Sequence, residues 1–346
     1  MCIPQDSAWK RVEPGIALTF PADHGMHPGY RTEWWYLTGH LEDETGARFG
    51  FQFTVFRRGL DPREPKEGEE PLRASDLYAG HLALTDVARG ETRFAERLRS
   101  SSPLARAARG ELDLALEDWT LKRGEGNVLA LSAADPARKI GLELALHPTK
   151  PLVQHGDKGY SKTGAEPGNA SAYVSWTRLT LEGKMQLDGA VRSVRGSAWF
   201  DHEFGSGVLD EGIVGWDWFG LQLDDGRELM LFVLRDAEGV PSAASAATLV
   251  AKDGTARALK GGDFTRKPTA TWKSAKSGAT YPARWTIAVP SEGLELELAP
   301  LVANCELDST STRITYWEGP VEVRGSAKGR GYAELTGYAG PLTGRF

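Results

Sequence analysis

A repeated pentapeptide constrains the fold of this chain more than any other feature of its sequence. Val194-Arg-Gly-Ser-Ala198 recurs unchanged as Val323-Arg-Gly-Ser-Ala327. Upstream of each copy lies a second recurring element, Trp34-Trp-Tyr36 in the first half and Trp216-Asp-Trp218 in the second, and each leads into a strand-like stretch. Two elements that recur in the same order predict two copies of one fold, with the pentapeptides in equivalent places.

The length of the chain supports two domains. It has 346 residues, which is more than one hydrophobic core usually supports. We predict a leader over residues 1–32, a first domain over 33–207 and a second over 208–346. Glycines cluster between Ser206 and Gly212, where we place the boundary. Prolines and glycines break any helix in the leader, so we expect an ordered segment or a plug over one barrel mouth.

Composition and periodicity predict an all-β protein of two antiparallel barrels. The 40 glycines, 19 prolines and 11 tryptophans are typical of short, aromatic-rich strands joined by turns. Residues 229–234 are apolar on both faces, which predicts a strand between the two domains or against cavity contents. Residues 92–110 hold the best helix candidate, cut short by Pro103. Residues 61–74 read as a surface loop, and 147–170 as a long functional loop.

Charge and cysteine content exclude several classes of partner. A net charge of −6 provides no basic field for nucleic acid, and no apolar run approaches the roughly 20 residues of a membrane span. Cys2 and Cys305 form no Cys-x-x-Cys pair, so no zinc ribbon or disulfide framework is indicated. Cys2, followed by a polar stretch, is typical of a trimmed lipoprotein and predicts a lipid anchor on a periplasmic or secreted bacterial protein, although no signal segment precedes it.

The stretch Gly196–Gly205 holds an aspartate, a histidine and a glutamate side by side between aromatic residues, namely Asp201, His202 and Glu203. Burial among aromatic side chains raises the pKa of a carboxyl group, which is how a general acid is made. The alternative is a strand whose acidic and aromatic side chains alternate between water and core. Residues 332–334 echo 199–201 with a glutamate but no following histidine, which argues against two equivalent active sites.

The remaining candidates are His27, Glu33 and His81, each beside an aromatic stretch of the first domain. With His202 they could form a metal site of three histidines and one carboxylate. No pair has the close spacing of metal ligands, so hydrogen-bonded histidines at a barrel end are the favoured interpretation and no metal is predicted. The sequence has no serine-hydrolase elbow, Walker loop or Rossmann fingerprint, so no cofactor is predicted.

Five motifs resemble signatures of the AttH/CrtC superfamily, which includes AttH-like proteins and carotenoid 1,2-hydratases. They are residues 27–36, 154–157, 159–162, 196–205 and 215–218, and the resemblance covers about residues 20 to 340. It implies two tandem lipocalin-like antiparallel barrels and, for the hydratase branch, acid-catalysed addition of water to an isoprenoid double bond. The acid of that branch would fall on Asp201. Carotenoid hydratases tend to have asparagine where this chain has Glu203.

The predicted function is therefore binding of a large apolar ligand, a lipid or isoprenoid, in an aromatic-lined cavity, followed by hydratase- or hydrolase-like chemistry. A non-catalytic carrier is the alternative, and a metal-dependent hydrolase is a third. The predicted catalytic residues are Asp201, His202, Glu33 and His81. The predicted ligand-binding residues are His27, Trp34, Trp35, Tyr36, Tyr160, Trp199, Glu203, Trp216, Asp217 and Trp218.

Overall fold

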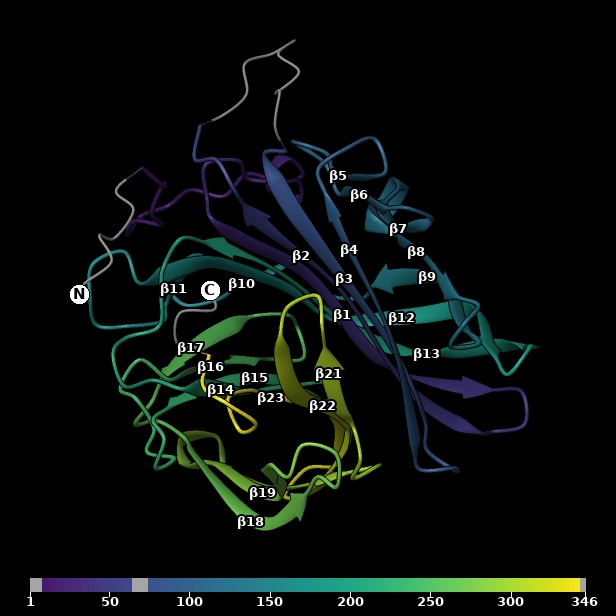
Figure 1. Ribbon diagram of the computed structural model, residues 1–346. Coiled ribbons are helices and arrows are strands. Elements are labelled where there is room, and N and C mark those ends of the chain that lie inside the picture. The colour runs from purple at the N-terminus through teal and green to yellow at the C-terminus, as the bar shows by residue number, and fades with distance from the viewer. Residues whose placement is uncertain (1–7, 64–73, 343–346) are drawn as a thin grey trace.

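The computed structural model describes residues 8–63 and 74–342 and consists almost entirely of antiparallel β-strands (Figure 1). The strands form two barrel-like sheets, one nearly closed and the other half a barrel. Helical structure in the described residues is confined to three short 3-10 turns, η1 (Ala22–His24), η2 (Glu125–Asn127) and η3 (Pro290–Glu292). The predicted fold class, two tandem lipocalin-like antiparallel barrels, is confirmed.

The first sheet has thirteen strands in the order β4-β3-β2-β1-β13-β12-β9-β8-β7-β6-β5, with β10 and β11 also paired to β12. Their bounds are β1 (Thr32–Asp43), β2 (Arg48–Gly59), β3 (Asp76–Asp86), β4 (Glu91–Ser100), β5 (Ala105–Ala107), β6 (Asp113–Leu116), β7 (Trp119–Arg123), β8 (Leu129–Asp135), β9 (Ile140–Pro148), β10 (Val153–Gln154), β11 (Tyr160–Lys162), β12 (Ala170–Leu187) and β13 (Ala190–Gly205).

The second sheet has ten strands in the order β17-β16-β15-β14-β23-β22-β20-β19-β18, with β21 also paired to β22. Their bounds are β14 (Gly215–Leu223), β15 (Glu228–Arg235), β16 (Ala246–Val250), β17 (Ala256–Lys260), β18 (Thr265–Lys273), β19 (Thr280–Val289), β20 (Leu294–Pro300), β21 (Glu306–Ser309), β22 (Ile314–Gly325) and β23 (Gly329–Leu335).

Both sheets are assembled in the same way, which supports the duplication. The first strand of each sheet, β1 or β14, pairs with the next strand and also with the last strand of its own sheet, β13 or β23. Tyr36 lies opposite Asp201 across the first of these pairs. Trp218 lies opposite Glu334 across the second. The aromatic and acidic echoes of the sequence therefore occupy equivalent places in the two sheets.

The repeated pentapeptide does not mark equivalent places, and this prediction was wrong. Residues 194–198 lie inside β13, whereas residues 323–325 end β22 and the next two lie in the bend before β23. Gly196 and Gly325 are each required by their own surroundings, for different reasons. A Cβ on Gly196 would overlap the carbonyl oxygen of His40, while Gly325 adopts a φ of +105° that side chains rarely tolerate.

The helix expected within residues 92–110 was also wrong. Residues 91–100 form β4, which pairs with β3 along its whole length, and residues 105–107 form β5. Helix propensity is a weak preference, and here the backbone hydrogen bonds to β3 override it. The segment 147–170, expected to lack structure, contains β10 and β11, both paired with β12.

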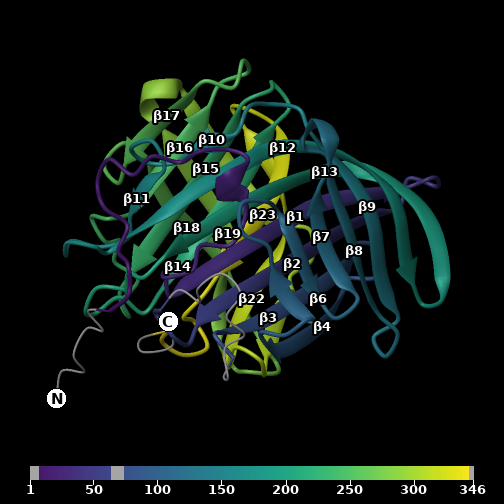
Figure 2. The ribbon, with the colours of Figure 1, turned by 90° about the horizontal axis from the view of Figure 1, so that it is seen from above.

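The two sheets pack against each other, with β22 and β23 lying across β2 and β1 (Figure 2). Each sheet also has its own inner core. The strand β15 is buried at every position, since Leu229, Leu231 and Val233 face the second core while Met230 and Phe232 face the first sheet. The predicted double-sided burial of this strand is confirmed.

The leader is ordered over the residues described and packs against the first sheet. Trp9, Val12 and His24 are buried, and Met26 contacts the first core. The indole nitrogen of Trp35 donates a hydrogen bond to the carbonyl oxygen of His24 at 3.2 Å. Cys2, with its predicted anchor, and most of the predicted surface loop 61–74 lie outside the described residues.

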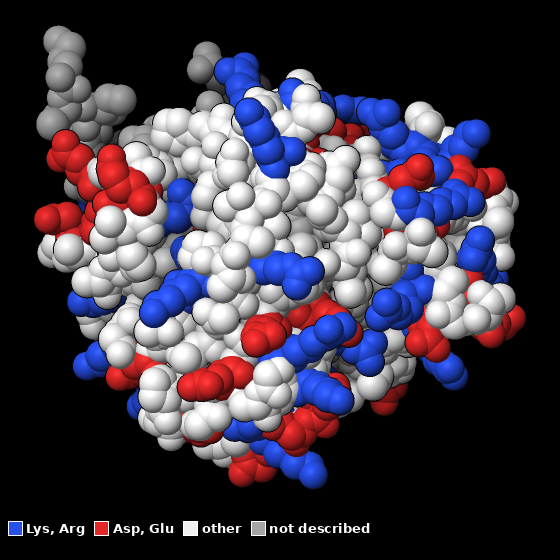
Figure 3. Space-filling view, turned by 90° about the horizontal axis from the view of Figure 1, so that it is seen from below, with Lys and Arg blue, Asp and Glu red and all other residues white. Residues whose placement is uncertain are grey.

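Two surface properties bear on partners. Among the described residues no helix has the length and apolar character that crossing a membrane would require. On the face in Figure 3, basic and acidic side chains alternate around the margin and below the centre, and the upper centre carries few charges.

Candidate functional site

A cavity of about 320 Å³ lies between the two sheets, within the size range of small-molecule sites. Its wall combines aromatic side chains from both sheets with a few acidic groups. The aromatic contribution includes Trp34 and Tyr36 from β1, Trp216 and Trp218 from β14, and Phe232 from β15. The cavity therefore depends on both halves of the chain, because neither sheet alone would enclose it.

The alternation of side chains along β13 divides the three adjacent titratable residues between two faces. Asp201 and Glu203 line the cavity between the sheets. His202 points to the opposite face, into the first barrel, where its ring stacks on Trp35 at a centroid distance of 4.9 Å. The structure thus corrects the expectation that the whole triplet acts on one ligand.

Three donors hold the carboxyl group of Asp201, which is only 3% exposed. Its Oδ1 accepts hydrogen bonds from the Trp199 indole nitrogen at 2.5 Å and from the Ser175 hydroxyl. Its Oδ2 accepts one from the Tyr173 hydroxyl at 2.9 Å. Tyr173 in turn receives the indole N–H of Trp218 at 3.0 Å, so its own proton points to Asp201. Since Oδ2 has one donor and Oδ1 has two, Oδ2 has room for a transferable proton.

The contacts of Asp201 continue through Ser175 to a buried histidine. His155 lies 2.7 Å from the Ser175 hydroxyl through Nε2 and 2.8 Å from the Thr248 hydroxyl through Nδ1. Ser175 donates to Asp201, so its oxygen accepts from Nε2–H, and Thr248 donates to Nδ1. Burial lowers the pKa of His155 to about 3, which keeps the ring neutral. Because Thr248 belongs to β16, this chain of hydrogen bonds joins the two sheets behind Asp201.

Three carboxyl groups at the cavity have raised pKa values. Burial raises the pKa of Asp201 to about 7, against the hydrogen bonds of its donors. Burial also raises the pKa of Glu203 to about 8, opposed by the Ser171 hydroxyl and reinforced by the negative charges of Asp201 and Glu334. Glu334, from β23, accepts a hydrogen bond from the indole N–H of Trp216 at 2.8 Å. Burial raises the pKa of Glu334 to about 7. The cavity therefore holds protons at neutral pH.

His81 lines another part of the same cavity. Its Nδ1 lies 2.8 Å from the Tyr316 hydroxyl, and its Nε2 lies 3.0 Å from the hydroxyl of Ser309. Burial lowers the pKa of His81 to about 4. The ring is therefore neutral at physiological pH and is fixed to the second sheet by these hydroxyl groups.

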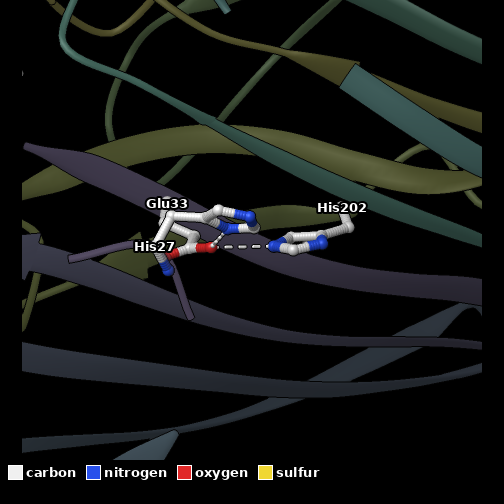
Figure 4. A group of neighbouring side chains, drawn as sticks. All are labelled: His27, Glu33 and His202. Atoms are coloured by element: carbon white, nitrogen blue, oxygen red, sulfur yellow. Dashed lines mark hydrogen bonds and ion pairs between the residues drawn. The ribbon is translucent and has the colours of Figure 1, made fainter. Parts of the chain in front are cut away.

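Glu33 organises a second polar group inside the first barrel (Figure 4). One carboxylate oxygen lies 2.8 Å from Nδ1 of His27 and 2.9 Å from Nε2 of His202, and the other accepts from Arg57 at 3.0 Å. Burial alone would raise the pKa of Glu33, but the two histidines and the guanidinium hold it below its usual value. Burial would likewise lower the pKa of His27, but hydrogen bonds to Asp23 and Glu33 raise it to about 9.

In the described part of the chain, His27, Glu33 and His202 form the group of side chains that most resembles a metal site. Ligand atoms of His27, Glu33 and His202 lie within 4.8 Å of one another. With a pKa of about 9, His27 carries protons on both ring nitrogens at neutral pH, whereas a metal ligand must be neutral imidazole. The Arg57 guanidinium already neutralises Glu33. In the absence of a metal ion, His27, His202 and Arg57 form a charge network around Glu33.

The structure places the predicted site residues in two groups. Eight line the cavity: Glu33, Trp34, Tyr36, His81, Asp201, Glu203, Trp216 and Trp218. Glu33 borders the cavity, but its carboxylate belongs to the network just described. Six do not line it: His27, Trp35, Tyr160, Trp199, His202 and Asp217. Trp199 still contacts Asp201, whereas Asp217 lies in a buried ion pair with Arg235 at 3.0 Å.

Four residues of the site were missing from the sequence prediction: Tyr173, Ser175, His155 and Glu334. Tyr173 lies opposite Glu203, and Ser175 opposite Asp201, across β12 and β13, so only the strand register brings them to the acid. His155 lies within residues 154–157, one of the five motifs that resemble the superfamily signatures, so this resemblance could have identified it. Glu334 was visible as the echo of Asp201, but its contribution to the same cavity depends on how the sheets pack.

Comparisons with known proteins give one family and one fold. A family described as AttH-like matches residues 11–338 of the chain. A candidate AttH protein from Nitrosomonas europaea is 34% identical, with a TM-score of 0.86 over 95% of this chain and 99% of that chain. Kievitone hydratase from Nectria haematococca is 15% identical, with a TM-score of 0.70 over 96% and 97%. CghA, in its structure with Sch210972, is 12% identical, with a TM-score of 0.52 over 89% of each chain.

The two distant likenesses establish a shared fold. A comparison with curated proteins finds no match.

Proposed function

Because this chain belongs to the AttH-like family and gathers three proton-holding carboxyl groups around one aromatic cavity, we propose that it is a hydratase-like enzyme. Its substrate is a largely apolar molecule with a carbon–carbon double bond, such as an isoprenoid or other lipid. Asp201 is the general acid. Kievitone hydratase has the same fold, and the case for this chain is argued from its site, because a shared fold does not by itself imply a shared function.

The observation that carries the proposal is the state of Asp201. Burial raises its pKa to about 7, so at neutral pH a large fraction of the molecules carry the acid form. A general acid works best when its pKa lies near the operating pH. Trp199, Ser175 and Tyr173 donate to the carboxylate, which stabilises the anion left after proton transfer.

The proposed reaction begins with a proton passing from Oδ2 of Asp201 to one carbon of the double bond. The π electron pair forms the new C–H bond and leaves a cation on the other carbon. The faces of the aromatic side chains at the cavity, among them Trp34 and Trp216, stabilise that charge by cation–π attraction. Water then adds to the cation, and the product alcohol forms when the water loses a proton.

The acceptor of that second proton follows from the relative basicities. Glu203, whose pKa is about 8, already carries its proton in most molecules at neutral pH. The first step leaves Asp201 as a carboxylate, and with a pKa of about 7 it is a stronger base than His81, whose pKa is about 4. We therefore assign the proton back to Asp201, which restores the acid. His81 serves to shape the wall of the cavity, and Glu33 and His202 serve the fold of the first barrel.

A panel of acyclic and cyclic terpenoid alkenes in heavy-oxygen water tests the proposal. Mass spectrometry of the products should show one heavy oxygen in an alcohol formed by the parent protein and not by the Asp201→Asn variant. A carrier is the competing function, since an apolar cavity is also what a carrier needs. Native mass spectrometry that finds a bound lipid, together with no turnover of any alkene or of the bound lipid, would favour the carrier.

A further inference from the structure

One cation at the cavity has no counter-charge in the described part of the chain. Arg58 lies at the end of β2 and lines the cavity, as Phe56 does two residues earlier on the same face. Its Nη1 is buried and has no hydrogen-bond partner, and the side chain forms no ion pair with any described residue. Burial and the neighbouring charge of Arg31 both lower the pKa of Arg58.

Arg58 is half-buried, and three fully buried or nearly buried cations of the described chain differ from it in having a carboxylate partner. Arg57, the adjacent residue on the opposite face, contacts both Glu33 and Asp76. Arg235 is paired with Asp217 at 3.0 Å, and Lys150 with Glu228 at 2.7 Å. Removing a charge from water without a partner costs free energy. An unpaired nitrogen at a ligand cavity therefore indicates a partner that arrives with the ligand.

We propose that Arg58 binds the anionic head group of the substrate, which is therefore an amphipathic monoanion with a carboxylate at one end. This inference rests on the proposed function and specifies its substrate class. A guanidinium matches a carboxylate in geometry and forms charge-assisted hydrogen bonds with it. A dianion is disfavoured because Asp201, Glu203 and Glu334 line the same cavity and would repel the additional charge when ionised.

The strand register also sets the length of this substrate. Arg58 lies opposite Thr32 of β1, and Asp201 lies opposite Tyr36. Because β2 and β13 lie on opposite sides of β1, the two residues are offset by about 13 Å along the strands and about 10 Å across them, which is roughly 16 Å in all. The double bond that Asp201 protonates is therefore separated from the carboxylate by an extended apolar chain of about that length.

Displacement of the neutral dye N-phenyl-1-naphthylamine tests the proposal without a known substrate. Trp34, Trp216 and Trp218 line the cavity, so energy transfer from tryptophan reports dye bound there. Decanoate, decanol and decyl phosphate serve as competitors of equal chain length. Decanoate should displace the dye from the parent protein at a concentration roughly tenfold or more lower than decanol, as a charge-assisted hydrogen bond predicts.

Arg58→Met should remove the advantage of decanoate and leave decanol unchanged, whereas Arg58→Lys should retain much of it. Arg195→Met is the matched control, because the Arg195 side chain is 80% exposed and does not line the cavity. Removing an unpaired cation should also keep or raise the thermal midpoint of Arg58→Met. A structural role of Arg58 would lower that midpoint and weaken all three competitors together.

The outcomes separate this inference from the function on which it rests. Dye binding with equal displacement by decanoate and decanol would overturn the anion site and leave the apolar cavity intact. Stronger displacement by decyl phosphate than by decanoate would overturn the monoanion assignment. Failure of the dye to bind at all would overturn both the substrate class and the proposed cavity function.

Discussion

Replacing Asp201 by asparagine separates a general acid from a structural aspartate, because the two roles predict opposite effects on stability at pH 8. The folded-state pKa is about 7, above the ordinary value of 3.8. The folded protein therefore holds this proton between pH 4 and 7, when the unfolded chain has lost it. Stability from this proton is present below pH 4 and is lost as the pH rises through 7.

The magnitude follows from the same two values. A pKa that rises from 3.8 to about 7 corresponds to about 4 kcal/mol of folding free energy, and the parent protein has lost this stabilisation by pH 8. The asparagine variant has no proton to lose. Its amide oxygen can still accept from Trp199 and Ser175, and its nitrogen faces the Tyr173 hydroxyl, which must then accept. We assign about 1 kcal/mol to that reversed hydrogen bond. The variant should be more stable than the parent at pH 8 by about 3 kcal/mol.

Urea denaturation followed by tryptophan fluorescence at pH 5 and pH 8 measures these differences. Asp224→Asn is the control, since Asp224 is exposed and should change neither value. Turnover of an identified substrate should fall by roughly 10² or more in Asp201→Asn, with ligand affinity nearly unchanged. A variant that is less stable than the parent by the same margin at both pH values would refute the raised pKa, and with it the acid role.

Three further predictions concern the surrounding charges. The stability of the parent should fall between pH 6.5 and 9 in thermal or urea unfolding. His27, with a pKa raised to about 9, and Glu203, with a pKa raised to about 8, keep protons in this range that the unfolded chain has released. Glu203→Gln should make the fall shallower, and an equally steep fall in this variant would contradict the raised pKa of Glu203. Glu33→Gln should cost about 3–5 kcal/mol in urea denaturation, because it leaves the buried Arg57 short of its partner, and a loss below about 1 kcal/mol would refute a buried ion pair there. A chelator should leave the thermal midpoint unchanged, and a fall that zinc restores would show that His27, Glu33 and His202 hold a metal after all.

Local patterns in the sequence determined the class of fold and the composition of the site. Alternating apolar residues and frequent turn residues specify antiparallel strands, because a strand presents its side chains to two faces with a period of two. The aromatic echoes at Trp34–Tyr36 and Trp216–Trp218 marked equivalent strands, since they lie opposite Asp201 and Glu334 in the two sheets. Asp201 itself was identified from its aromatic neighbours. Such features depend on residues close together in the chain.

Tertiary structure decided which of these residues meet. The same period of two separates His202 from Asp201, but only the packing of the second sheet makes one face of β13 a cavity wall and the other a barrel core. Register across β12 and β13 brings Ser175 to Asp201, and contact between sheets brings His155 to Thr248. The identical pentapeptides occupy different places because short identical segments carry no information about their partners. Pairing between strands that are distant in sequence is stabilised by contacts between those strands, so the local sequence of either strand does not specify it.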